Sequence, residues 1–153
     1  MTTVHWNPYL SIGHDGIDAE HQDLVKVLND LITRIEDGAE LGEVRDGLGR
    51  LIEETERHFR HEEAVMEREA YPEAEHHCHL HQALSTEIRA FDAELAGGKE
   101  MGPEITDFIR DWLIHHILKS DMRLGGYLEG RESGWRLRNR PAGRKPRWRN
   151  RCP

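Results

Sequence analysis

Hydrophobic residues recur at the spacing of an α-helix in four stretches of the chain, and no stretch shows the alternation typical of a β-strand. Gly and Pro residues separate these stretches. We predict helices over residues 16–37, 41–69, 72–96 and 103–128. Four amphipathic helices of about 20–28 residues with short connections predict an all-α fold, an antiparallel up-down-up-down four-helix bundle.

The helical pattern ends near Gly130, where the charge of the chain also changes. Residues 131–153 hold nine of the 21 Lys and Arg residues and one acid, a net charge of +8, whereas residues 1–130 carry a net charge of −16. We therefore predict one domain over residues 1–130 and a basic, disordered tail over residues 131–153. The acidic body argues against specific nucleic-acid binding, and the tail could contact an anionic surface or lie against the body.

The composition also bears on where the protein works. No stretch approaches the roughly 20 apolar residues of a membrane span, and the N-terminus lacks the pattern of a signal peptide. The two cysteines, Cys78 and Cys152, are too few for a disulfide framework and fit a reducing compartment. We expect a soluble cytoplasmic protein, and since nothing in the pattern demands an oligomer, we expect a monomer.

The functional signal is a set of polar residues on the apolar helix faces. Histidine is unusually common, at 11 of 153 residues. Residues four apart share a helix face, so His58 with Glu62, and His77 with His81, form two pairs of side chains on one face. All four helices contribute, and the residues that continue an apolar stripe are His21, His58, Glu62, His77, His81 and His116.

A seventh residue, Asp121, follows His116 by five positions. On an ideal α-helix this places it about 140° around the axis from His116. We expect Asp121 to reach the interior from the flank of the helix unless the helix is locally unwound there.

These polar residues are hard to bury without a cation. A buried carboxylate needs a partner, and the same faces carry almost no positive side chain. A single such histidine is more often a hydrogen-bonded core residue, but the agreement of four helices predicts a pair of metal ions. Imidazole ligands together with bridging carboxylates favour iron. A ferritin-like site would need two Glu-x-x-His motifs, and the chain offers only Glu73-x-x-His76, which faces differently from His77.

Together these motifs resemble the hemerythrins, specifically the bacterial hemerythrin-like single-domain proteins (bacteriohemerythrins). The resemblance extends from about Trp6 to Leu128. It rests on Asp18-Ala-Glu-His21-Gln22, His58-Phe59-Arg-His-Glu62-Glu63, Tyr71-Pro72 followed by His77-x-x-x-His81, and Trp112-Leu113-x-x-His116-Ile117-x-x-x-Asp121.

The resemblance implies a non-haem di-iron centre that binds O2, with a bridging oxo or hydroxo group between Fe²⁺ or Fe³⁺ ions. One iron would keep an open position, and O2 would bind there. Trp112 and Leu113 are candidates to line the O2 pocket, although ordinary core packing explains them equally well. By position, His77, His81 and His116 would hold one iron, His21 and His58 the iron that binds O2, and Glu62 and Asp121 would bridge both.

The other histidines of the helices are expected at the surface or beside the ligands. They are His61, His76, His79 and His115. His76 or His115 could replace its neighbour as a ligand if the register differs, but the spacing of the resembling motifs favours His77 and His116.

Reversible O2 binding suits several roles. We favour an oxygen carrier or store without catalysis of its own, which supplies an oxygen-consuming enzyme or a redox partner. The alternatives are an O2 or redox sensor acting through a partner, a di-iron enzyme of the oxidase or peroxidase type, and metal handling by a histidine-rich surface.

Overall fold

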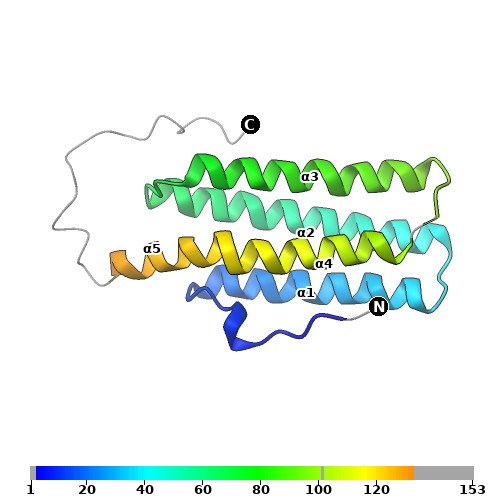
Figure 1. The fold of residues 1–153 in the computed structure, drawn as a ribbon, viewed down its shortest axis with the longest axis horizontal. Helices are drawn as coiled ribbons and strands as arrows, with labels where there is room; N and C mark the ends of the chain where they lie inside the picture. The colour runs from blue at the N-terminus through cyan, green and yellow to red at the C-terminus, as the bar shows by residue number, and fades with distance from the viewer. Residues whose placement is uncertain (1–2, 101, 133–153) are drawn as a thin grey trace.

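The computed structural model describes residues 3–100 and 102–132 (Figure 1). The tail expected at residues 131–153 lies outside the described residues from position 133 onward. Every regular element in the described residues is helical, in agreement with the prediction. The elements are η1 (Pro8–Leu10), α1 (Asp15–Glu36), α2 (Leu41–Arg68), α3 (Ala74–Ala96), α4 (Pro103–His116), the π-helical turn η2 (Ile117–Asp121) and α5 (Met122–Glu132).

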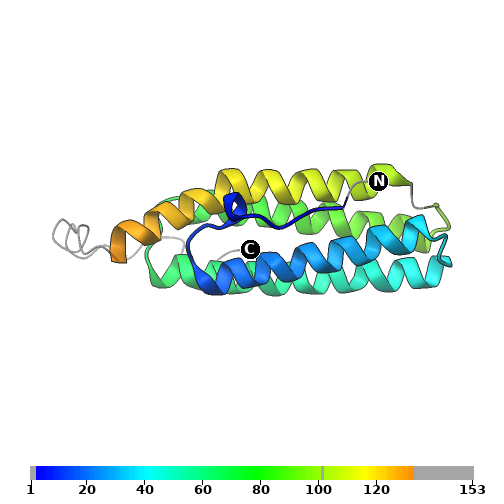
Figure 2. The same cartoon turned by 90° about the horizontal axis from the view of Figure 1, so that it is seen from below.

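The helices form the predicted up-down-up-down bundle. Helices α1, α2 and α3 and the rod formed by α4, η2 and α5 lie lengthwise beside one another, and the chain turns back at alternate ends (Figures 1 and 2). The segment before α1 runs back along the outside of the bundle (Figure 2). Val4 holds it there, because its backbone N–H donates to Asn29 Oδ1 and its carbonyl accepts from Asn29 Nδ2, both at 2.8 Å.

The turn between α1 and α2 has clear sequence causes. Gly38 adopts a φ of +72°, which favours glycine, and the N–H of Ala39 donates back to the carbonyl of Arg34 at 2.9 Å. A capping box between Glu40 and Glu43 then starts α2. Two adjacent helices therefore reverse direction within a few residues.

Aliphatic side chains from all four rods form one core around the long axis of the bundle. Gly47, which interrupts the helical pattern of the sequence, is buried where α2 approaches α1. A Cβ added there would lie 3.2 Å from Leu31 Cδ1, so the small residue permits close packing. None of the helices in the described part of the chain combines the length and the apolar character that a membrane crossing requires.

The fourth rod differs from the expected uninterrupted helix. Between α4 and α5 the backbone forms the π-helical turn η2 and continues to Glu132, beyond the predicted end at Leu128. A π turn pairs residues five apart instead of four, so it inserts one residue into an otherwise α-helical rod. The turn ends at Asp121, inside the group of polar residues that the sequence analysis selected.

Candidate metal centre

The bundle interior contains a cluster of buried polar side chains. None of its members is more than 4% exposed. They come from all four rods, as the sequence pattern predicted. The members are His21 on α1, His58 and Glu62 on α2, His77 and His81 on α3, His116 on α4 and Asp121 on η2.

The nitrogen and oxygen atoms of this cluster fall into two groups that could each hold a metal ion. Within each group the ligand atoms all lie within 4.8 Å of one another. Both groups contain the carboxylates of Glu62 and Asp121. The first group adds His77, His81 and His116, and the second adds His21 and His58.

Glu62 directs one oxygen toward each group. Its Oε2 lies 2.9 Å from His58 Nε2, and its Oε1 lies 2.8 Å from His77 Nε2. The same Oε1 is 4.0 Å from His81 Nε2. This is the arrangement of a carboxylate that bridges two ions.

Asp121 has the same arrangement from the opposite rod. Its Oδ1 lies 3.0 Å from His77 Nε2 and 2.9 Å from His116 Nε2, and its Oδ2 lies 3.0 Å from His21 Nε2. The π turn accounts for this position, because residue i+5 of a π turn lies over residue i, whereas on an α-helix it would lie to one side. The helix is therefore locally unwound before Asp121, which the sequence analysis allowed for as the alternative to an approach from the helix flank.

Two further carboxylates orient the imidazole rings from outside the cluster. Glu20 Oε2 accepts from His58 Nδ1 at 2.8 Å, and Glu63 Oε1 accepts from His81 Nδ1 at 2.9 Å. Such contacts fix which ring nitrogen faces the metal. The sequence analysis did not assign them a role. The sequence feature that could have pointed to them is adjacency to a predicted ligand, since Glu20 precedes His21 and Glu63 follows Glu62.

Aromatic rings pack on two of the histidines. The indole of Trp112 stacks on His116, with centroids 4.6 Å apart and planes 11° apart. The ring of Phe59 stacks on His81, at 3.8 Å and 7°. Leu113 is buried in the core. Trp112 thus braces a histidine of the first group, a contact that the apolar pattern alone did not reveal.

The electrostatics of the cluster favour histidines that hold protons when no metal is bound. Burial lowers the pKa of His58, but the nearby carboxylates of Glu20 and Glu62 outweigh it and raise that pKa to about 10. The pKa of His77 rises to about 9, because its contacts with Asp121 and Glu62 outweigh burial.

The remaining shifts follow the same balance of burial and charge. Burial and the charge of Asp121 oppose ionisation of Glu62, but the neighbouring histidines lower its pKa to about 2. Burial also opposes ionisation of Asp121, but His116, His21 and His77 outweigh this effect and hold its pKa well below the usual range. Burial lowers the pKa of His81 despite its hydrogen bond to Glu63.

Several buried atoms of the cluster make no hydrogen bond within the described part of the chain. Both oxygens of Glu62, both oxygens of Asp121 and Nε2 of His81 are in this state, although other ring nitrogens lie near the carboxylates. Buried polar atoms are rarely left unsatisfied. Two cations between the carboxylates would satisfy these atoms. Five imidazoles with two shared carboxylates form a donor set that suits iron.

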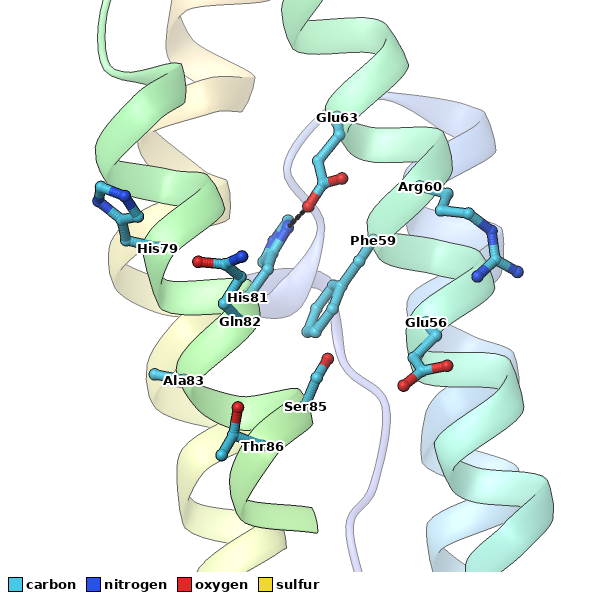
Figure 3. A pocket seen from close by; sticks show the side chains of 10 residues that line it. All are labelled: Glu56, Phe59, Arg60, Glu63, His79, His81, Gln82, Ala83, Ser85 and Thr86. Carbon is cyan, nitrogen blue, oxygen red and sulfur yellow. Dashed lines mark hydrogen bonds and ion pairs between the residues drawn. The ribbon is translucent and has the colours of Figure 1, made fainter. Parts of the chain in front are cut away.

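The exposed histidines fit the chosen register. His76, His79 and His115 face solvent, while their neighbours His77 and His116 point inward. Figure 3 shows the labelled His79 turned away from the labelled His81. His61 is 42% exposed at its side chain. The structure thus places His77 and His116 in the buried cluster and leaves His76 and His115 outside it.

A groove of about 730 Å³ between α2 and α3 reaches the edge of the cluster (Figure 3). The His81–Glu63 hydrogen bond and the ring of Phe59 form part of its wall. Both His81 and Phe59 are buried, at 1% and 5% exposure. Solvent in the groove thus approaches Glu63 while the rings shield the cluster.

Comparisons with known proteins agree with this site. The model of the hemerythrin HHE cation binding domain matches residues 13–128. A bacteriohemerythrin of Pseudomonas paraeruginosa is 26% identical over 129 residues, which cover 84% of this chain and 82% of that protein. Myohemerythrin-1 of Phascolopsis gouldii is 28% identical over 123 residues, which cover 80% and 92%.

A solved structure agrees as well. The crystal structure of a wild-type hemerythrin matches with a TM-score of 0.78 and 26% identity, and the match covers 83% of this chain and 98% of that chain. The family model spans most of the bundle, and the two clustered ligand groups lie within its limits. The chain belongs to the hemerythrin family.

Proposed function

We propose that this chain binds O2 reversibly at a di-iron centre and serves as an oxygen carrier or store. The observation that carries the proposal is the pair of shared carboxylates, each with one oxygen directed at each histidine group. The residues that would hold the two irons are His77, His81 and His116 on one side, His21 and His58 on the other, and Glu62 and Asp121 between them.

The two groups differ in the number of protein donors. Three histidines and two carboxylates would give a first ion five donors, whereas two histidines and two carboxylates would give a second ion four. An ion held by the second group would have fewer protein ligands and so more room for an external ligand. When bound, the iron pair supplies the position for that ligand and the electrons that O2 binding requires.

The protein contributes a shielded environment around that position. The donor residues are at most 4% exposed, and Leu113, which precedes His116 by three positions on α4, is buried as well. Exclusion of water favours reversible binding, because water and external reductants would otherwise react at the centre. Leu113 remains our candidate for lining the O2 pocket, whereas Trp112 is better placed to hold the ring of His116.

A carrier or store needs a recipient. We propose an oxygen-consuming enzyme or a redox partner in the cytoplasm, with residues 1–130 as the binding domain and residues 131–153 as an appendage.

Cycled oxygenation tests the proposal. Iron-loaded protein is reduced without air, exposed to O2 and then returned to an O2-free atmosphere while its visible spectrum is recorded. We expect an absorption band that appears with O2, disappears without it and returns on the next cycle. Immediate irreversible oxidation without such a band would contradict a carrier and would favour a sensor or an oxidase.

A further inference from the structure

A chain of hydrogen bonds connects the second ligand group to the protein surface. Glu20 accepts from His58 through Oε2 at 2.8 Å and from His61 through Oε1 at 2.9 Å. His58 is 2% exposed at its side chain, Glu20 19% and His61 42%. Three side chains thus lead from the buried ligand to solvent, with Glu20 shared between two imidazoles.

The first ligand group has a different outer contact. There, among the residues that the structure describes, Glu63 accepts from one imidazole, that of His81, at 2.9 Å. The outer carboxylate that bonds to two imidazoles belongs to the group with fewer donors, which is the proposed O2-binding side. The two ligand groups therefore differ both in their number of donors and in the outer carboxylate that contacts them.

Packing holds the ring of His61 in place despite its exposure. The ring of His14 meets it edge-on, with centroids 6.4 Å apart and planes 66° apart. His14 is itself fixed, because its Nδ1 accepts from the N–H of Ile17 at the start of α1. A Cβ added at Gly16 would lie 3.4 Å from both rings, so the backbone also approaches them closely. His61 is thus set toward Glu20 by its neighbours.

A carboxylate that accepts two hydrogen bonds attracts each donor less strongly than one that accepts a single bond. The hydrogen bond from a ligating imidazole to an outer carboxylate strengthens that imidazole as an electron donor to the metal. Hydrogen bonding of this kind is one of the means by which proteins set reduction potentials. By sharing Glu20, His61 would reduce the electron donation of His58 and favour the ferrous state.

We propose that His61 is a positioning residue that acts through Glu20 on His58 and raises the reduction potential of the ion held by His21 and His58. The inference rests on the proposed di-iron function, and it adds a specific device for keeping that ion reduced. It involves no change in the protonation of His61. A higher potential slows the loss of electrons that ends reversible O2 binding.

Paired substitutions with opposite expected effects test this role. His61→Leu removes the donor and leaves Glu20 wholly to His58, so the midpoint potential should fall. Glu20→Gln replaces the charged acceptor by a neutral one, so the potential should rise. We expect each change to be roughly threefold in the reduction equilibrium, about 30 mV for a one-electron couple. A merely structural disturbance would not produce shifts of opposite sign.

Two further variants make the test specific. His61→Asn places an amide nitrogen where Nδ1 of His61 lies, so it should restore the potential close to that of the unaltered protein. The double variant His61→Leu with Glu20→Gln should match Glu20→Gln alone, because His61 acts only through Glu20. His5→Leu is the matched control, since His5 is an exposed histidine outside the cluster. Equal potentials in all variants, or additive shifts in the double variant, would overturn the proposal.

A second measurement does not depend on iron chemistry. In zinc-loaded protein, the NMR signal of the His58 Nδ1 proton reports the strength of its bond to Glu20. We expect a downfield shift in His61→Leu and an upfield shift in Glu20→Gln, and an unchanged signal would overturn the proposal. Failure of O2 cycling in the unaltered protein with these shifts intact would refute the carrier function alone, and normal cycling without the shifts would refute the role of His61.

Discussion

Asp121 Oδ1 lies 2.9 Å from His116 Nε2, although the two residues are five positions apart on one helical rod. The π turn η2 between them makes this contact, since an α-helix would bring residue 120 toward the face of His116. The rod therefore departs from α-helical geometry where a carboxylate must face the histidines. Downstream, Gly125 packs against the carbonyl of Ile12 where no Cβ would fit, so α5 has little freedom to rotate.

The π turn leads to a prediction about chain length. Deletion of Leu118, which is 45% exposed, removes the extra residue and leaves Asp121 four positions after His116, on the same face of an α-helix. We expect metal content to remain within about twofold of normal, as measured by metal analysis after iron loading.

Insertion of one alanine after Leu118 is the matched opposite change. It rotates Asp121 and α5 by about 100° and should abolish most metal binding. Equal loss of metal in the deletion and the insertion would contradict this account of η2. Circular dichroism on both variants checks that the bundle still forms.

Single substitutions test the ligand set. Glu62→Ala removes the carboxylate that both groups share, and we expect it to lower iron content from two ions per chain to less than one. His77→Ala should cost at least the ion of its own group. His79→Ala is the control, because His79 is an exposed neighbour on the same helix. A comparable loss in His79→Ala would mean that the assigned register is wrong.

The pKa values predict how the metal-free protein responds to pH. His58 and His77 have folded-state pKa values of about 10 and about 9, above the ordinary 6.5. Their contribution to the stability of the folded state is full below pH 6.5 and is lost as the pH rises through about 9 to 10. We expect the denaturant midpoint of metal-free protein to fall between pH 7 and pH 10.

Metal binding should remove the dependence of folding stability on pH, because metal-bound histidines are neutral. Loading metal-free protein with Zn²⁺ at pH 7 should release about two protons, one each from His58 and His77. A pH indicator in weak buffer measures the release. No release, or the same alkaline loss of stability in zinc-loaded protein, would contradict the proton assignment.

Truncation tests whether the binding domain is independent of the tail. A chain that ends at Glu132 keeps every residue of the two ligand groups. We therefore expect unchanged iron content and O2 affinity, measured by metal analysis and O2 titration. A loss of either would show that residues 133–153 take part in the site.

Most of the bundle and the buried cluster could be predicted from the sequence. The apolar stripes are strong, and polar residues such as His58 and Glu62 stand out against them because burial without partners is costly. The fold and the family were confirmed. The structure brings the selected side chains together in the bundle interior, and their role as metal ligands stays a prediction.

The remaining features depend on contacts between distant segments. Asp121 could be placed only relative to an ideal helix, and a π turn has no reliable signature in one sequence. Glu20 and Glu63 resemble ordinary charged residues of a solvated face until the structure brings histidines against them. His14 carried no periodic signal, yet its ring caps α1.

We infer that two metal ions hold the carboxylates and imidazoles together in the bundle interior. Anomalous X-ray scattering at the iron edge, from crystals of iron-loaded protein, tests it most directly. We expect two iron peaks, both between Glu62 and Asp121, one beside His81 and the other beside His21. A single peak, peaks at the surface histidines, or side chains turned away from an empty centre would contradict it.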